Sequence, residues 1–128
     1  MSENVKLDLV IEKSDQKLWG RVTYNESLIT DEANTVAELE TNIRKLLIEL
    51  EDVTSEIEFE LFYDVYALFE QFDFINITKF AKYAGINAGQ LRQYASGVKN
   101  PRKEQALKIE TALHQFSAEL QKVSVYAA

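Results

Sequence analysis

The most constraining feature of this sequence is its hydrophobic period, which changes from two to about 3.6 and back within residues 5–63. Apolar and polar residues alternate in VKLDLVIE (5–12) and LWGRVTY (18–24), as is typical of half-buried strands. The intervening KSDQK indicates a turn, so the two segments predict a hairpin. SLIT (27–30) predicts a short third strand.

Residues 35–52, TVAELETNIRKLLIELED, change to helical spacing. Their apolar residues fall three or four apart and would form one stripe on a helix: Val36, Leu39, Ile43, Leu46, Leu47 and Leu50. Thr35 and Glu38 have the spacing of a capping box, which marks the start of the helix. SEIEFELFYDVY (55–66) then returns to period two. The first part of the chain is therefore predicted to be β-β-β-α-β, an antiparallel sheet with one helix packed on it.

The second part of the chain predicts helices only. A short helix is expected within residues 66–72, and Asn76 is a good N-cap for ITKFAKYA (77–84). Asn87 is expected to cap AGQLRQYAS (88–96), and Gly85 and Gly97 to end the two helices in a left-handed conformation. Pro101 is predicted to start a long helix, whose apolar stripe is Ala106, Ile109, Leu113, Phe116 and Leu120. The predicted fold class is α+β, with one domain at 1–65 and an all-α domain at 66–128.

Two short helices joined by a glycine-containing turn of about three residues predict a helix-turn-helix. In that motif the second helix lies in the major groove of DNA and presents side chains near its N-terminus to the base edges. One such unit reads only a half-site, so a homodimer on double-stranded DNA is expected. Two surfaces are candidates for the contact between the two copies: the sheet of the first part and the long C-terminal helix.

Charge is distributed unevenly along the 128 residues, whose formal net charge is −7. Residues 1–73 hold 6 Lys and Arg and 18 Asp and Glu, a net charge of −12. Residues 74–108 hold 7 basic residues and one acid, a net charge of +6. A surface that meets phosphates gains affinity from Lys and Arg through counterion release, and a carboxylate there would repel DNA. The charge pattern therefore indicates an acidic part and a DNA-binding part.

Candidate DNA-contacting residues lie on and around the helix at 88–96. Gln90 and Gln93 are one turn apart, and a glutamine amide can both donate to and accept from adenine. Arg92 is expected to read guanine or to bind a phosphate, and Tyr94 is expected to pack beneath the helix. The predicted set is completed by Asn87, Lys79, Lys82, Lys99, Asn100 and Arg102. The alternative is that these are ordinary solvated side chains, and for each lysine alone that alternative is favoured.

Residues 80–113, FAKYAGINAGQLRQYASGVKNPRKEQALKIETAL, resemble the Xre/Cro-type helix-turn-helix. The features that carry this resemblance are Phe80-Ala81, Ala84-Gly85, Leu91, Gly97, Lys99 and Pro101. A β-β-β-α-β part followed by this motif resembles the HicB-like antitoxins. LWGRV and LITDEANTVAELETNIRKLL follow the plan of their N-terminal domain, a partial ribonuclease-H-like fold without ribonuclease activity that covers the toxin.

The resemblance to HicB-like proteins implies a DNA-binding antitoxin of a type II toxin–antitoxin system. Such a protein would be a homodimer that represses its own promoter and neutralises a small basic ribonuclease toxin. An alternative is a stand-alone dimeric transcriptional regulator without a toxin. The segment YNESLITDEA favours this alternative, because it has neither Pro nor Gly where the family usually has a Pro/Gly-rich stretch.

Enzymatic activity is not expected. His114 is the single histidine, and no nucleophile, base and acid form a recognisable set. A third hypothesis, a metal-dependent nuclease using Glu56, Glu58, Glu60 and Asp64, is the weakest of the three. The absence of cysteine excludes disulfides and thiolate metal sites, and no cofactor is expected. Neither a long apolar run nor a signal-peptide apolar region is present, so a cytoplasmic protein without membrane association is expected.

Overall fold

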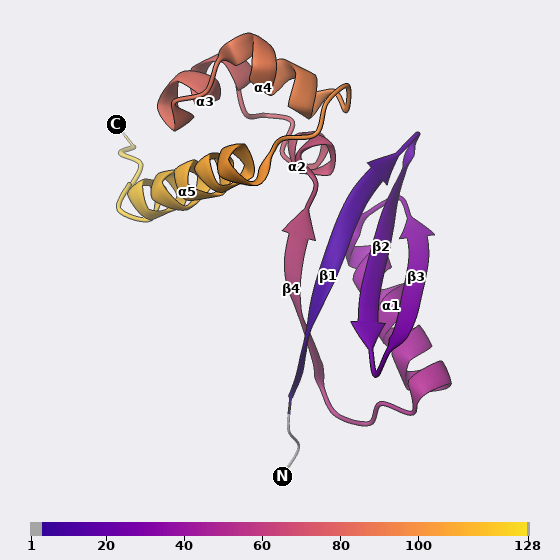
Figure 1. The fold of residues 1–128 in the computed structure, drawn as a ribbon. Coiled ribbons are helices and arrows are strands. Elements are labelled where there is room, and N and C mark those ends of the chain that lie inside the picture. The colour runs from indigo at the N-terminus through magenta and orange to yellow at the C-terminus, as the bar shows by residue number, and fades with distance from the viewer. Residues whose placement is uncertain (1–3, 128) are drawn as a thin grey trace. The chain divides into compact units, whose positions relative to one another are not determined.

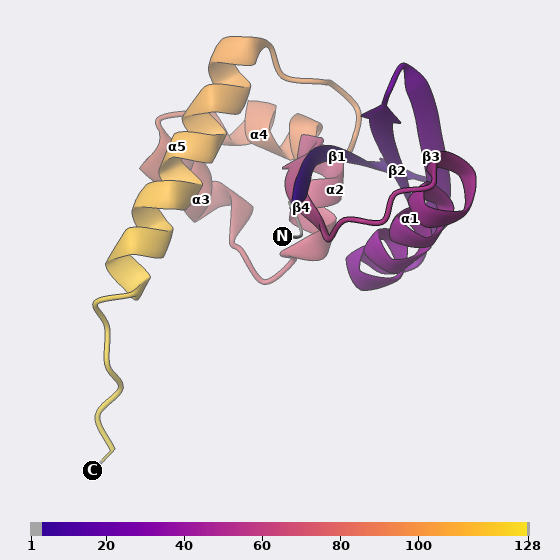
Figure 2. The same cartoon turned by 90° about the horizontal axis from the view of Figure 1, so that it is seen from below.

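The computed structural model describes residues 4–127 and confirms the α+β class, with one four-stranded mixed sheet and five helices (Figures 1 and 2). The chain forms two compact units, Met1–Leu68 and Phe69–Ala128. The elements in chain order are β1 (Val5–Ser14), β2 (Lys17–Tyr24), β3 (Ser27–Ala33), α1 (Val36–Glu51), β4 (Ile57–Tyr63), α2 (Val65–Gln71), α3 (Ile77–Ala84), α4 (Ala88–Ala95) and α5 (Lys103–Leu120).

The sheet has the strand order β3-β2-β1-β4. β1 and β2, and β2 and β3, are antiparallel, but β4 runs parallel to β1. The predicted antiparallel sheet is therefore wrong at β4. The reason is the connection through α1, which carries the chain from β3 across β2 to the far side of β1 (Figure 1). A helical crossover of this kind joins strands that run in the same direction, whereas a hairpin reverses them.

α1 packs on one face of the sheet and forms the core of the first unit with it (Figure 1). Leu39, Ile43 and Leu47 of α1 are fully buried, as the helical stripe predicts. Leu46 is only partly buried and Leu50 is exposed, so the stripe is narrower than the pattern indicates. The strands contribute alternate residues of one face: Leu9, Ile11, Leu18, Val22 and Ile29.

The predicted start of α1 is confirmed by its hydrogen bonds. The Thr35 hydroxyl accepts from the Glu38 backbone N–H at 3.1 Å. The Glu38 carboxylate accepts from the backbone N–H of Asn34 at 3.4 Å, one residue before the cap position of a regular capping box. The first bond satisfies an amide that a helix start leaves without an intrahelical partner, and the second ties the residue before the cap to the first turn.

α5 departs from the prediction at both ends. It begins at Lys103 with Arg102 in the N-cap position, so Pro101 precedes the helix instead of occupying its first turn. Its buried residues are Ile109 and Ala112, whereas Phe116 and Leu120 of the predicted stripe are exposed. The apolar stripe therefore continues beyond the part of α5 that packs into the core of the helical unit.

Asp64 links β4 to α2 and gives the first unit a pH-dependent element. Its carboxylate accepts from the Ala67 backbone N–H at 2.7 Å. Partial burial raises the pKa of Asp64 above its ordinary value, the hydrogen bonds from the backbones of Ala67 and Lys13 oppose the rise, and the Glu12 carboxylate adds to it. The folded protein thus binds this proton more tightly than the unfolded chain does. The resulting stabilisation is present below the unfolded pKa and is lost as pH rises through the folded pKa.

We expect Asp64→Asn to remove this pH dependence and to retain the cap, because asparagine is as good an N-cap as aspartate. Urea unfolding of both proteins at several pH values from about 3 to 7 measures the difference. The variant should gain stability relative to the wild type as pH rises. A constant difference across that range would contradict the raised pKa.

Candidate nucleic-acid interface

α3 and α4 form the candidate interface, and buried side chains fix them against each other. Phe80 and Ala81 of α3, Ile86 of the connection, and Leu91 and Tyr94 of α4 are all buried. The burial of Tyr94 confirms that this aromatic packs beneath α4. α3 and α4 pack against each other, and the hydrogen bonds of the connection set how the chain passes between them.

The connection between α3 and α4 has three residues, Gly85 to Asn87. Gly85 has φ 74°, the left-handed conformation predicted for it, and Ile86 donates its N–H to the Ala81 carbonyl at 2.9 Å. The Asn87 side chain then accepts from the Gln90 N–H at 3.0 Å and caps α4. Asn76 caps α3 in the same way by accepting from Lys79 N–H at 2.9 Å. The three local signals that the sequence gives here, at Asn76, Gly85 and Asn87, are confirmed.

The outward side of α4 carries the predicted base-reading residues. Gln90, Arg92 and Gln93 are exposed, and Gln93 lies on the side of the helix opposite to the buried Leu91 and Tyr94. Gly89 is also exposed on this side. The first turn of α4 therefore has little side-chain bulk, so that the backbone and the two glutamines can approach a ligand surface closely.

Arg92 does not extend freely from α4. Its guanidinium donates to the hydroxyl of Thr78, in the first turn of α3, at 3.0 Å. Neither side chain is buried, so the bond is accessible to solvent and to a bound ligand. Thr78 thus holds Arg92 in a defined position next to the outward side of α4. A side chain that is already ordered loses less conformational entropy when it binds.

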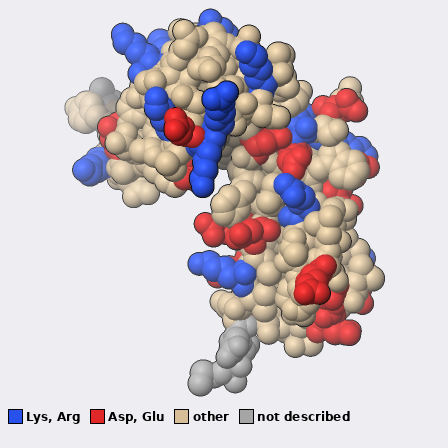
Figure 3. All heavy atoms as spheres, in the orientation of Figure 1, with Lys and Arg blue, Asp and Glu red and all other residues tan. Residues whose placement is uncertain are grey.

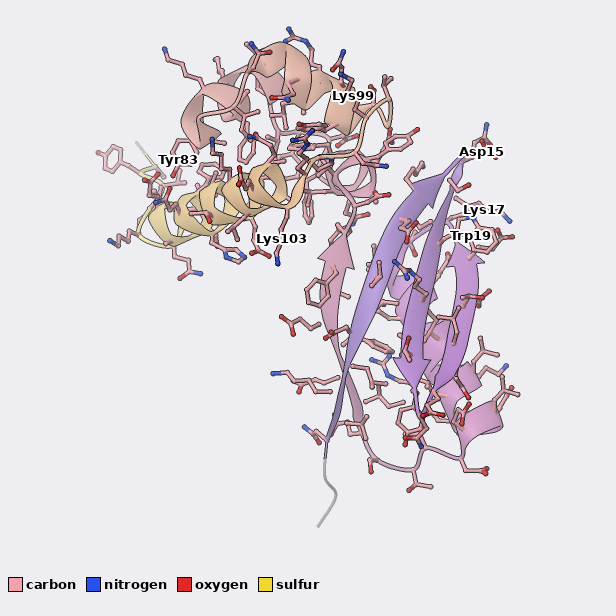
Figure 4. All side chains as sticks on the ribbon, viewed as in Figure 1. Asp15, Lys17, Trp19, Tyr83, Lys99 and Lys103 are labelled. Carbon is pink, nitrogen blue, oxygen red and sulfur yellow. The ribbon has the colours of Figure 1, made fainter. Side chains whose placement is uncertain are left out.

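The segment after α4 brings a lysine close to Gln93. The backbone N–H groups of Val98 and Lys99 both donate to the Gln93 carbonyl, at 3.0 and 3.2 Å. Gly97, at φ 81°, permits this reversal of the chain, as predicted. Lys99 is exposed here (Figure 4), and Asn100 and Arg102 are exposed in the same connection to α5. Five of the predicted residues therefore lie on α4 or within the five residues that follow it: Gln90, Arg92, Gln93, Lys99 and Asn100.

The remaining predicted residues have different positions. Lys79 and Lys82 are exposed on α3. Arg102 stands at the N-cap of α5. The carbonyl oxygen of the Asn87 side chain is used in the cap. Residues 74–103 contain no Asp or Glu, and Lys and Arg side chains stand out over the visible face of the helical unit (Figure 3). The segment that forms the interface therefore carries amide and cationic side chains and no carboxylate.

Sequence reasoning missed two residues of this surface. Thr78 carries no local signal, because its contact with Arg92 joins positions 14 residues apart. Val98 is 72% exposed between Gly97 and Lys99, although it is a β-branched apolar residue. The available signal was that Val98 is an isolated aliphatic residue within Ser96-Gly97-Val98-Lys99-Asn100. An exposed apolar group beside cations suits contact with a deoxyribose or a thymine methyl group.

The acidic residues considered for a metal-dependent nuclease do not form a metal site. Among residues 4–127, no group of three or more His, Cys, Asp and Glu side chains has an arrangement that could hold a metal ion. Asp64 serves as a cap for α2. Glu58 and Glu60 are exposed on β4, where they alternate with residues of the opposite face.

In the part of the chain that the structure describes, no helix has the length and apolar character needed to cross a membrane.

Comparisons of the chain with protein-family models, with curated proteins and with solved structures found no match.

Proposed function

We propose that this protein binds double-stranded DNA sequence-specifically through α3 and α4, as a helix-turn-helix, and represses transcription. The observation that carries the proposal is the outward side of α4. Gln90, Arg92 and Gln93 are exposed there on a helix fixed by the Asn87 cap and the buried Leu91 and Tyr94. Rigid presentation of amide and guanidinium groups, in a segment without carboxylates, matches what the major groove requires.

In this proposal α4 enters the major groove with its first turns against the base edges. Gln90 and Gln93 pair with adenine, and Arg92, positioned by Thr78, pairs with the N7 and O6 acceptors of guanine. Lys79, Lys82, Lys99 and Arg102 contact phosphates, and Asn100 and the cap residue Asn87 assist at the backbone. The phosphate contacts fix the register of the protein but carry no sequence information.

The biological unit on DNA is a homodimer in this proposal. One α4 covers only a half-site, and two copies about one helical turn apart read a two-fold symmetric operator. The expected operator is therefore a pair of inverted half-sites upstream of the gene that encodes the protein.

The acidic β-sheet unit supports the finer proposal of a HicB-like antitoxin. Met1–Leu68 hold 6 Lys and Arg and 16 Asp and Glu, a net charge of −10, and a potential of this sign accelerates encounter with a small basic protein. The role is neutralisation of a ribonuclease toxin together with repression of the shared promoter. The stand-alone regulator remains the second candidate, since YNESLITDEA has neither Pro nor Gly. Co-purification distinguishes them, because a small basic protein encoded beside this one accompanies only the antitoxin.

The experiment that tests DNA binding measures affinity for the protein's own upstream DNA and for a random duplex of the same length, across a salt series. We expect preference for the upstream DNA, with both affinities falling as salt rises. For the eight Lys and Arg contacts of a homodimer the affinity should fall by about 10⁴-fold between 50 and 200 mM salt. Equal and weak affinity for both duplexes at low salt would overturn the proposal.

A further inference from the structure

The free edge of the sheet presents unpaired backbone groups along β4. β4 is the end strand of the sheet, beside β1, with β3 at the opposite edge (Figure 1). The Val5 N–H donates to the Glu56 carbonyl at 2.7 Å, and the Asp64 N–H donates to the Ile11 carbonyl at 2.9 Å. Even-numbered residues of β4 therefore bond to β1. Because strand geometry alternates, the N–H and C=O groups of Phe59 and Leu61 are directed away from β1, toward the open edge.

A side chain of α1 already occupies one end of this edge. The Arg44 side chain donates to the Ile57 carbonyl at 3.4 Å, and its guanidinium lies 5.0 Å from the centre of the Phe59 ring. The carbonyl of Ile57 is thus satisfied within the unit. The accessible stretch begins at Phe59 and continues through Leu61.

β4 lacks the protection that β3 has. On β3, Asp31 occupies the same side as the buried Ile29 and Ala33, and an inward-pointing charge of this kind prevents another strand from pairing at an edge. The corresponding positions of β4 at Phe59 and Leu61 are apolar, and its register with β1 continues without a bulge. Leu61 and Phe62 remain 38% and 41% exposed. An added strand would bury this apolar surface.

The carboxylates of β4 disfavour a second copy as the added strand. In a two-fold antiparallel pair, the residue at the centre faces itself and its neighbours face one another in reverse order. A pair centred on Phe59 places Glu58 opposite Glu60, and one centred on Glu60 places that residue opposite itself. A pair centred on Leu61 places Glu58 opposite Asp64. Directly opposed like charges destabilise a strand pair, so each register is penalised.

We propose that the β4 edge accepts a strand from a basic partner protein, in which Lys or Arg alternates with apolar residues. The backbone groups of Phe59 and Leu61 bond to that strand, its cations lie beside Glu58 and Glu60, and its apolar residues cover Leu61. Main-chain bonds supply affinity and the alternate side chains supply specificity in this mode of binding. The inference rests on the proposed function, in that it assigns to the acidic unit the surface that binds the basic partner.

The test uses the full chain and a synthetic peptide in which Lys and Val alternate. Amide hydrogen exchange of Phe59 and Leu61 should slow about tenfold with the peptide at ten times its dissociation constant. Exchange at Glu58 and Glu60, whose amides already bond to β1, should change little. The same peptide with Glu in place of Lys, or with N-methylated Val, should not protect either residue.

Two variants complete the test. Leu61→Pro removes an N–H that makes no bond to β1, so it should fold and lose peptide binding. Glu58→Gln with Glu60→Gln keeps the edge intact and should weaken binding of the Lys peptide at low salt.

Equal binding of the Lys and Glu peptides would overturn the inference. Protection of the Phe59 and Leu61 amides in a dimer of this chain, without peptide, would also overturn it. DNA affinity is measured on the same samples. If the wild-type protein binds its operator but not the Lys peptide, the inference is contradicted. If it binds the peptide but not the operator, the proposed function is contradicted.

Discussion

Replacing Arg92 and Gln93 together by alanine is expected to lower operator affinity by about 30-fold to 10⁴-fold. Each bidentate contact with a base contributes about 1–3 kcal/mol of discrimination, so two contacts amount to about 2–6 kcal/mol. Both side chains are exposed, so their removal should leave the stability of the helical unit within about 0.5 kcal/mol of the wild type. Fluorescence anisotropy with operator and random duplexes measures the change, and urea unfolding verifies the fold.

The matched control is the double variant Gln121→Ala and Lys122→Ala. It also removes one amide and one positive charge, from exposed positions after α5. Operator affinity should change by less than about threefold, because only the general electrostatic attraction is reduced. If the two double variants lose the same affinity, Arg92 and Gln93 act through charge alone and α4 is not the reading helix.

Thr78→Val tests whether Arg92 is positioned by its neighbour. The substitution removes the hydroxyl that accepts from Arg92 and retains the shape of the side chain. The loss of operator affinity should be smaller than for the alanine variants and should disappear when Arg92 is already alanine. An equal loss with either residue at position 92 would mean that Thr78 contacts DNA directly.

The parts of the interface that depend on local signals could be predicted from the sequence. Asn76 and Asn87 as caps, and Gly85 and Gly97 as helix ends, need only residues a few positions away, and the structure has all four. The contacts that order the surface were not predictable in this way. Arg92 meets Thr78, 14 residues earlier, and a periodic pattern holds no information on which exposed side chains meet across two helices.

The fold shows the same limit. Hydrophobic period located β1, β2, α1 and β4, but period two is identical for a strand and for its reverse. The parallel direction of β4 follows from the path of the chain through α1. The period likewise could not show that Phe116 and Leu120 of α5 lie beyond the core of the helical unit. The direction of β4 and the extent of the buried part of α5 both depend on how the elements pack together. Local sequence patterns do not determine that packing.

Leu39 of α1 lies directly against Gly20 of β2, and we expect substitutions at these two positions to be strongly coupled. A Cβ atom at Gly20 would overlap Leu39 Cδ2, and would lie 2.9 Å from Leu39 Cγ and 3.0 Å from Ile43 Cδ1. Leu39 and Ile43 are fully buried and have no free space to enter. Gly20→Ala should therefore cost about 1–3 kcal/mol by overpacking. Leu39→Ala should cost about 2–5 kcal/mol, because it leaves a cavity at the same point.

The double variant should be destabilised by about 1–3 kcal/mol less than the sum of the single effects, since the new methyl group enters the space that Leu39 vacates. Urea unfolding of the four proteins, followed by far-ultraviolet circular dichroism, gives this coupling free energy. Leu47→Ala is the control: Leu47 is equally buried but lies two turns along α1, and its effect should add to that of Gly20→Ala. Additivity in both pairs would contradict the close contact, whereas coupling with Leu39 alone establishes that residue 20 is glycine because α1 lies directly upon it.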